Sequence, residues 1–299
     1  MRLFPKSKRT AIFLPLLSIF SSTRGYTILV LVIAQYLSAR YILAPQRGWA
    51  EHLLDYRLFL LVLASSLAIA GGYLINNFYD AEKDRINRPQ QYLLNQLIQP
   101  KQQLGFYALF NFLSLLFSLV VSPRACLFFV AYIGGMWLYS HVLKRTFWAS
   151  NVFAALLAIT PFFAMGLYFN NLSTWVLYHA SYLFLIILIR DVVKDLQNFK
   201  GDWVRGYQTT AVVFGERSTK YILSFLSFMA LAVVALLLVQ KDQLGGMYYY
   251  FLFCVLSLLL LVLVLWFAQS KKLYLWLHNG LKLLILAGVA SIVFVRYTL

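Results

Sequence analysis

The stretch LFLLVLASSLAIAGGYLINNFYD, residues 58–80, begins with about twenty residues that carry no charge and ends at Asp80. A run of this length crosses the ~30 Å hydrocarbon core of a bilayer as one helix. Two further acids, Glu82 and Asp84, follow directly, with Lys83, Arg85 and Arg88 among them. Because carboxylates are costly at a membrane boundary, this placement indicates that the acids have a function.

The composition of the whole chain agrees with a membrane protein. Of its 299 residues 62% are hydrophobic and 12% are charged, with a mean hydropathy of +0.74, whereas soluble domains have roughly 25% charged residues. The net charge of +16 is spread between apolar segments, so it does not indicate a nucleic-acid-binding domain. Cys126 and Cys254 lie inside apolar runs and are interpreted as core residues.

The apolar segments predict an all-α membrane protein, a bundle of about nine transmembrane helices in a single domain, residues 1–299. Residues 1–25 form a cytoplasmic or interfacial N-terminal segment, in which the apolar run 11–20 is too short to span a bilayer. The nine predicted spans are 26–45, 58–79, 104–122, 125–143, 149–169, 173–190, 221–240, 247–268 and 279–298.

The distribution of basic residues predicts the orientation. With a cytoplasmic N-terminus, 20 of the 26 Lys and Arg residues fall on the cytoplasmic side of these nine spans, as the positive-inside rule requires. We therefore expect a multi-pass protein of a bacterial or archaeal cell membrane. Six of the ten acids fall into the clusters 80–84 and 191–202, which both lie at cytoplasmic helix ends.

The first cluster has helical spacing. Asn76, Asp80 and Asp84 follow one another at intervals of four residues, and at about 100° per residue each step turns only ~40° around the helix. The three side chains therefore share one face, which Glu82 does not.

The second cluster has a similar pattern. Its polar members lie within a wedge of about 60° if the helix continues through Gly201; they are Asp191, Asp195, Asn198 and Asp202. Oxygen-rich faces of this kind suit Mg²⁺, which takes few protein ligands and shares its remaining positions with phosphate.

Basic side chains beside the acids suggest an anionic substrate. Candidate donors to phosphate oxygens are Lys144 and Arg145 in "YSHVLKR", together with Lys83, Arg85, Arg88, Arg190 and Lys194. Acids and bases beside apolar helices suggest a metal-bound diphosphate on an isoprenoid tail. An aromatic face such as that of Tyr139 would stabilise the carbocation that forms when the diphosphate leaves.

These residues resemble a known family. "NNFYDAEKDRINRP" (76–89) is similar to the N-x-x-x-D-x-x-x-D signature of the UbiA superfamily of intramembrane prenyltransferases. "YSHVLKR" is similar to its Y-x-x-x-K/R loop, and "DVVKDLQNFKGDWVRGYQTTAVVFGE" to its second aspartate region with the trailing G-x-x-T-x-x-x-x-x-G. The stretch "IRDVVKDLQNFKGD" is most similar to members related to digeranylgeranylglyceryl phosphate synthase.

The resemblance implies a central cavity open to the bilayer, two Mg²⁺ ions on the diphosphate, and prenyl transfer to a lipophilic acceptor. No obligate protein partner is evident from the sequence. The resemblance implies these metal ligands: Asn76, Asp80, Asp84, Asp191, Asp195, Asn198 and Asp202. It implies that diphosphate contacts Asn76, Arg85, Arg88, Lys144, Arg145 and Lys194. The catalytic candidates are Tyr139, Lys144, Asp80 and Asp195.

One departure from the family pattern leaves the second metal site open. Many members have an aspartate where this chain has Asn198, which offers one neutral oxygen and binds a cation less strongly. Asp195, one turn earlier on the same face, is a candidate to share that role. Which of the four polar residues of this cluster bind metal stays open at this point.

The sequence favours a prenyltransferase over two other classes of membrane protein and leaves the acceptor open. The acceptor could be an ether lipid of the geranylgeranylglyceryl phosphate type or an aromatic ring of quinone biosynthesis (hydroxybenzoate, naphthoate or homogentisate). An ion-coupled transporter is the rival class, although the chain has no evident internal repeat. A structural membrane subunit would leave Asn76, Asp80 and Asp84 unexplained.

Overall fold

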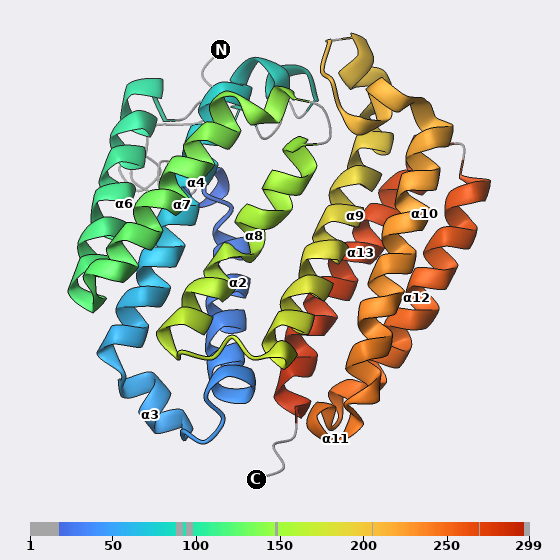
Figure 1. The fold of residues 1–299 in the computed structure, drawn as a ribbon. Coiled ribbons are helices and arrows are strands. Elements are labelled where there is room, and N and C mark those ends of the chain that lie inside the picture. Colours follow the sequence, from blue (N-terminus) through green and yellow to red (C-terminus); the bar gives the residue numbers. More distant parts are fainter. Residues whose placement is uncertain are drawn as a thin grey trace, which may run out of the picture. The chain divides into compact units, whose positions relative to one another are not determined.

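The computed structural model describes residues 18–87, 92–93, 98–146, 149–204, 206–268 and 270–295. Within these ranges every regular element is a helix (Figure 1), as expected for a membrane-spanning bundle. The chain divides into two compact units. Unit 1 comprises the chain up to Ile33 and Asp55–His141, and unit 2 comprises Ala34–Leu54 and Val142–Leu299.

Unit 1 is built around one long helix. It contains α2 (Gly25–Ser38) as far as Ile33, α4 (Tyr56–Asn87), α6 (Pro100–Val121) and α7 (Pro123–His141). α4 packs against both α6 and α7, which also pack against each other. The first acidic cluster is thus at the end of the helix that forms the centre of this unit.

Close approach of α4 and α6 depends on a glycine. A Cβ atom at Gly71 would lie 2.7 Å from Oδ1 of the buried Asn111. The same pair of helices is joined by polar side chains: Ser114 Oγ donates to the Ala64 carbonyl at 2.8 Å, and Gln103 Nε2 donates to the Leu74 carbonyl at 2.9 Å. In a bilayer the hydrophobic effect drives the association of helices only weakly, because lipid tails are as apolar as the side chains. Small residues and hydrogen bonds of this kind stabilise the helix pair instead.

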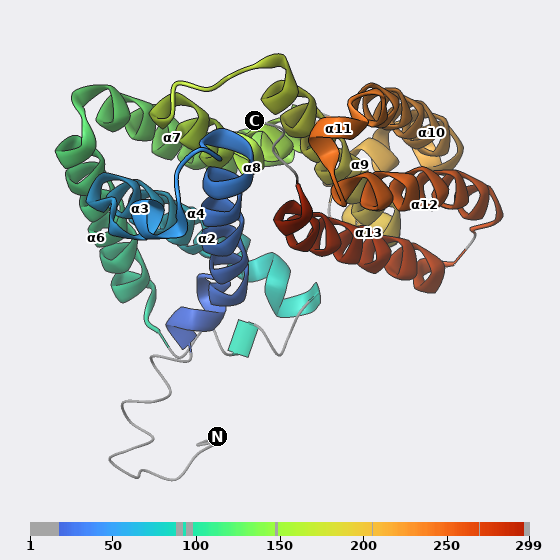
Figure 2. The ribbon, with the colours of Figure 1, turned by 90° about the horizontal axis from the view of Figure 1, so that it is seen from below.

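Unit 2 groups the remaining helices. α9 packs against α8, α10 and α13, and α12 packs against α10 and α13, as the view along the helices shows (Figure 2). Its elements are the end of α2, the π-helical turn η1 (Ala39–Leu43), α3 (Trp49–Leu54), η2 (Leu143–Arg145), α8 (Ala149–Tyr168), α9 (Thr174–Val204), α10 (Thr210–Val239), α11 (Lys241–Leu244), α12 (Met247–Phe267), α13 (Lys271–Ser291) and η3 (Ile292–Phe294).

A buried polar cluster holds α9, α12 and α13 together. The hydroxyl groups of Tyr182 and Tyr250 lie 2.7 Å apart, and Tyr182 is 3.0 Å from the thiol of Cys254. Tyr250 also donates to the Leu284 carbonyl at 3.1 Å. Each of these three side chains thus has a hydrogen-bonding partner in the apolar interior. Cys254 is a free, buried core residue, which confirms the interpretation of the sequence.

The nine predicted spans correspond to nine long helices of the described residues. Eight of these helices are long and apolar enough to cross a membrane. The ninth, α7, is less apolar because Arg124, Ser140 and His141 lie within its 19 residues.

Helix ends differ from the prediction where charges occur. α10 begins at Thr210 rather than 221, and α13 begins at Lys271 rather than 279. α9 continues through Gly201 to Val204. Hydropathy marks only the part of a helix that suits hydrocarbon, so it misses turns that extend beyond it. The continuity of α9 places all four polar residues of the second cluster on one helix.

The long helices fall into two groups according to their length. α4, α9 and α10 have 32, 31 and 30 residues. The other long helices of the two units, α6, α7, α8, α12 and α13, have 22, 19, 20, 21 and 21 residues. Two of the three longest helices carry the acidic clusters, and the third packs against α9.

Replacement of Gly71 by alanine should destabilise the protein, because the new methyl group meets Asn111 at 2.7 Å. Overpacking of this kind costs about 1–3 kcal/mol. Gly105→Ala is the matched control, since no atom lies within 4 Å of a Cβ there. The thermal unfolding midpoint in detergent should fall for the first variant and stay level or rise for the second; equal midpoints would contradict the packing described for α4 and α6.

Candidate metal and diphosphate site

The end of α4 presents the first group of predicted ligands. Asn76 and Asp80 are half-buried and lie one turn apart on this helix, as the spacing predicted. Asp84 follows one turn later within α4, but its side chain is outside the described part of the structure. Arg85 is exposed, and Arg88 lies outside the described residues.

Neighbouring side chains anchor this part of α4. Asn77 is buried, and its Nδ2 donates to the Ser22 carbonyl at 2.6 Å. The ring of Tyr79 lies 5.3 Å from that of His141, which stacks on Trp137 at 5.1 Å. These contacts hold the helix turn that carries Asp80, so its carboxylate is presented from a fixed backbone.

The predicted loop residues follow α7. Tyr139 is half-buried near the end of α7, in unit 1. Lys144 is half-buried in the 3₁₀ turn η2, in unit 2. Arg145 belongs to the same turn, with its side chain outside the described part. The loop motif is therefore divided: Tyr139 belongs to unit 1, and Lys144 and Arg145 belong to unit 2.

On α9 the structure gives the two aspartates different partners. Asp191 accepts hydrogen bonds from its neighbour Arg190, at 2.9 Å from Nη2 and 3.1 Å from Nε, and the two form an ion pair. Asp195 accepts a hydrogen bond of 2.7 Å at Oδ2 from Nδ2 of Asn151 on α8. Asp202 is buried, and Asn198 and Lys194 are half-buried.

Two residues at this site were not predicted. Nδ2 of Asn151 also lies 3.3 Å from Oγ1 of Thr210, at the start of α10. Asn151 thereby joins α8, α9 and α10 at one point. The sequence feature that could have identified Asn151 is its amide inside the apolar run 149–169, because a buried polar residue needs a hydrogen-bond partner.

A break in α10 follows Thr210. Gly215 has φ 78° and ψ 168°, a conformation that is essentially restricted to glycine. Oγ1 of Thr219 donates to the Gly215 carbonyl at 2.7 Å and lies 3.4 Å from the Thr210 carbonyl. The trailing glycine of the sequence pattern therefore shapes the turn that carries Thr210.

A charged cluster stabilises the helix just after this break. Nζ of the buried Lys220 lies 3.0 Å from Glu216 Oε1 and donates to the Ala268 carbonyl at 2.6 Å. The hydroxyl of Tyr274 donates to Glu216 at 2.7 Å and lies 3.1 Å from the same carbonyl. This cluster joins α10 to the connection between α12 and α13.

Within the described side chains, no three His, Cys, Asp or Glu residues gather at a spacing that would hold a metal ion. The predicted acids are divided between α4 in unit 1 and α9 in unit 2. Either helix by itself offers oxygen ligands of the kind that Mg²⁺ takes, since this ion needs few protein ligands and completes its coordination with water and phosphate oxygens.

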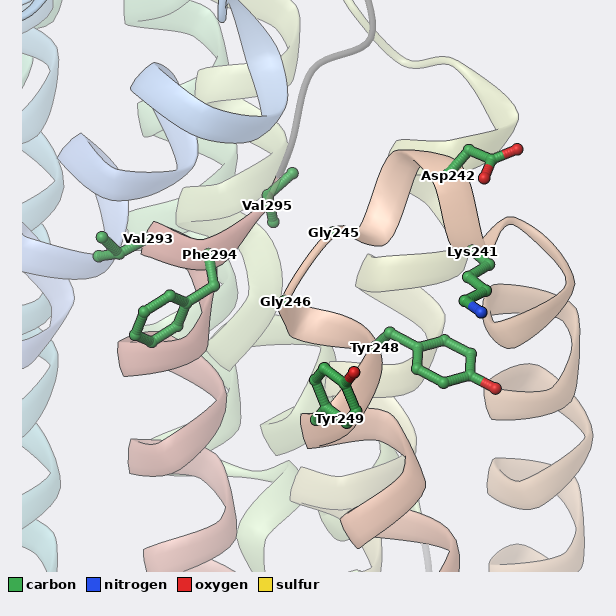
Figure 3. Close-up of a pocket in the computed structure, with 9 residues that line it drawn as sticks. All are labelled: Lys241, Asp242, Gly245, Gly246, Tyr248, Tyr249, Val293, Phe294 and Val295. Atoms are coloured by element: carbon green, nitrogen blue, oxygen red, sulfur yellow. The ribbon is translucent and has the colours of Figure 1, made fainter.

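A pocket of about 680 Å³ lies elsewhere in unit 2 (Figure 3). Figure 3 shows Lys241 beside Tyr248, whose ring centroid is 5.3 Å from Nζ. The 30 residues of α10 separate this pocket from Thr210, roughly 45 Å at 1.5 Å per residue. It is therefore distinct from the predicted site. Its lining residues are Lys241, Asp242, Gly245, Gly246, Tyr248, Tyr249, Val293, Phe294 and Val295.

The helices and the acids at their ends define a multi-pass α-helical membrane protein with a polar site beside its apolar spans. The model of the UbiA prenyltransferase family matches residues 31–284, which include most of both units. The chain belongs to this family and is a membrane prenyltransferase. This assignment argues against the transporter alternative.

Curated relatives agree. The chain is 35% identical over 196 residues to the digeranylgeranylglyceryl phosphate synthase of Thermococcus gammatolerans, with 64% of this chain and 68% of the relative covered. It is 32% identical over 225 residues to the enzyme of the same name from Korarchaeum cryptofilum, with 74% and 79% covered.

Solved structures share the fold. A structure described as digeranylgeranylglyceryl phosphate synthase superposes with a TM-score of 0.71 at 20% identity, over 93% of this chain and 97% of the other. A UbiA homologue from Archaeoglobus fulgidus bound to GPP and Mg²⁺ superposes with a TM-score of 0.66 at 16% identity, over 92% and 99%.

Replacement of Lys220 by methionine should destabilise the junction of α10, α12 and α13. The change removes a buried hydrogen bond from a charged donor, worth about 1.5–3 kcal/mol. Lys241→Met is the control, because Lys241 is exposed at the other end of α10 and its contact with Tyr248 is worth below about 1 kcal/mol. If both variants unfold at the same temperature in detergent, Lys220 does not have this role.

Proposed function

We propose that this chain transfers a prenyl group from a prenyl diphosphate to a lipophilic acceptor within the membrane, and that the reaction requires Mg²⁺. The observation that supports this most directly is the oxygen-donor face at the end of each of two long spans, Asn76 and Asp80 on α4 and Asp195 on α9. Basic side chains adjoin both positions, with Arg85 on α4 and Lys194 on α9.

The donor set fits Mg²⁺, because carboxylate and amide oxygens are its usual protein ligands. Asp195 is the better ligand on α9, because its hydrogen-bond partner at Oδ2 is a neutral amide, whereas Asp191 forms an ion pair with Arg190. We propose two ions, one held by Asn76, Asp80 and Asp84, and the other by Asp195 with Asn198 and Asp202. When bound, Mg²⁺ stabilises negative charge on the diphosphate.

In the proposed reaction the bond between the allylic carbon and the diphosphate oxygen breaks, and diphosphate leaves with the electron pair. The acceptor oxygen then bonds to the carbon and releases its proton. Lys144, Arg145 and Lys194 would stabilise the departing diphosphate, and the ring of Tyr139 would face the allylic cation.

For the acceptor we propose a glycerol-phosphate ether lipid of the geranylgeranylglyceryl phosphate type. The support is the name shared by the curated relatives from Thermococcus gammatolerans and Korarchaeum cryptofilum, together with the similarity of "IRDVVKDLQNFKGD" to members of that kind. Such an acceptor has a charged head and an apolar tail, which suits a polar site beside lipid-facing helices.

We further propose that both units form one domain, with the family match spanning them. The excess of basic residues on one side supports a cytoplasmic N-terminus and active site in the cell membrane of a bacterium or archaeon.

Replacement of Asp80 by asparagine should lower turnover per folded molecule by at least about 100-fold, because it removes a charge from the proposed metal face. Leu74→Ala is the control from the same helix: Leu74 is fully buried, so its truncation should cost about 2–5 kcal/mol of stability while the specific activity of the folded fraction is retained. Pyrophosphate release by purified protein measures activity. Retained specific activity in the Asp80 variant would exclude the role given to this residue.

Removal of divalent cations should abolish turnover, and added Mg²⁺ should restore it. Purified protein is incubated with geranylgeranyl diphosphate and either geranylgeranylglyceryl phosphate, hydroxybenzoate, naphthoate or homogentisate, and the products are identified by mass spectrometry. We expect product with the phosphate lipid. Product with an aromatic acceptor alone would overturn the proposed acceptor but not prenyl transfer, whereas turnover in excess EDTA would overturn the requirement for metal.

A further inference from the structure

Asn151 lies at a buried polar contact that joins three helices of unit 2. It is 9% exposed, in the first turn of α8. Its Nδ2 is 2.7 Å from Asp195 Oδ2 and 3.3 Å from Thr210 Oγ1. The shorter of these distances lies at the short end of the range for N–H···O hydrogen bonds.

The donors and acceptors around Asn151 determine the orientation of its amide. An amide nitrogen has two protons, and here each has an oxygen to receive it, one on Asp195 and one on Thr210. The Oδ1 atom of Asn151 lies 3.4 Å from Oγ of Ser150, which donates to it. A flipped amide would place Oδ1 against the Asp195 carboxylate, two acceptors facing each other, so the nitrogen must face α9.

The chemistry of the donor matters for a metal ligand. A cationic partner would compete with a metal ion for the carboxylate charge, as Arg190 does at Asp191. A neutral amide orients a carboxylate and stabilises its ionised form without supplying an opposing charge. The contact at Asp195 is to Oδ2, so it does not engage Oδ1, whose lone pairs can face a cation.

From this geometry we propose that Asn151 is a positioning residue for the metal site: it orients the Asp195 carboxylate for Mg²⁺, and Thr210 orients Asn151. This inference rests on the proposed function. Asn151 does not touch the metal; it acts through Asp195, as outer residues do when they hold a ligating side chain in one orientation.

The position of Thr210 is itself determined by the break in α10. The glycine conformation at Gly215 turns the chain, and Thr219 Oγ1 donates to the Gly215 carbonyl at 2.7 Å and lies 3.4 Å from the Thr210 carbonyl. Oγ1 of Thr210, which receives the second amide proton, therefore belongs to a turn whose conformation is stabilised by Gly215 and Thr219. Asp195 is oriented from α8 and α10 together.

The test measures metal binding apart from turnover. Mn²⁺, which prefers the same oxygen ligands as Mg²⁺, is titrated into the purified full-length protein and the free ion is followed by electron paramagnetic resonance. The Mg²⁺ concentration for half-maximal turnover is measured in parallel. Asn151→Leu keeps the size of the side chain and removes the donor. Thr210→Val removes the oxygen that orients the amide, and Thr210→Ser retains it.

The control is Asn171→Ala. Asn171 is also an asparagine whose amide donates to a distant partner, the Leu43 carbonyl at 2.8 Å, but it follows the opposite end of α8. Its replacement should lower the unfolding temperature and leave Mn²⁺ affinity unchanged.

Loss of the Asn151 amide should weaken Mn²⁺ binding about 10- to 100-fold and raise the Mg²⁺ requirement by a similar factor. Thr210→Val should shift both values in the same direction, and Thr210→Ser should restore them. Wild-type Mn²⁺ affinity in the Asn151→Leu protein, with only a lower unfolding temperature, would overturn the inference.

If the Asn151→Leu protein does not fold, the two Thr210 variants provide the test. Equal Mn²⁺ affinities for Thr210→Val and the wild-type protein would then overturn the inference. Failure of the proposed function looks different, because the wild-type protein itself would then bind no Mn²⁺ and release no pyrophosphate.

Discussion

A carboxylate beside a membrane stays ionised only where the protein or water replaces the hydration that it loses. On α9 two acids on neighbouring turns have different hydrogen-bond partners, a guanidinium at Asp191 and a neutral amide at Asp195. Only the first of these partners carries a charge. The hydrogen-bond partner of each acid, more than its position on the helix, therefore distinguishes the two: Asp191 is suited to a structural ion pair, and Asp195 is suited to binding a cation.

The arrangement of unit 2 follows from the same requirement. Asn151 can reach Asp195 only because α8 begins beside the acidic end of α9, and its amide is oriented because α10 begins at the same place. The glycine break at 215 allows α10 to start there, and the Glu216–Lys220–Tyr274 cluster holds the helix that follows. Polar contacts thus determine where three apolar helices meet, since apolar contacts with lipid and with protein differ little in energy.

Sequence reasoning predicted the helices and the family well, because both depend on local patterns. Uninterrupted apolar runs identify spans, and the spacing of Asn76, Asp80 and Asp84 identifies a helix face. It did not predict Asn151 or Thr210, because their roles depend on contacts 44 and 59 residues apart along the chain. Nor did it predict the partners of the α9 acids: Asp191 and Asp195 each follow a basic residue in the sequence, but the structure pairs Asp191 with Arg190 and Asp195 with Asn151 of α8.

The unequal lengths of the helices have a consequence for the binding of an amphipathic substrate, which has an ionic head and an apolar tail. A helix of 30 to 32 residues is roughly 45–48 Å long, about 15 Å more than the hydrocarbon thickness. On α4 and α9 the excess lies at the end that carries the acids, since the uncharged part of α4 stops at Tyr79. The acids therefore lie where the apolar part of each helix gives way to charged residues. A substrate with an ionic head and an apolar tail matches this change along the helix, because its head suits the charged end and its tail suits the apolar part.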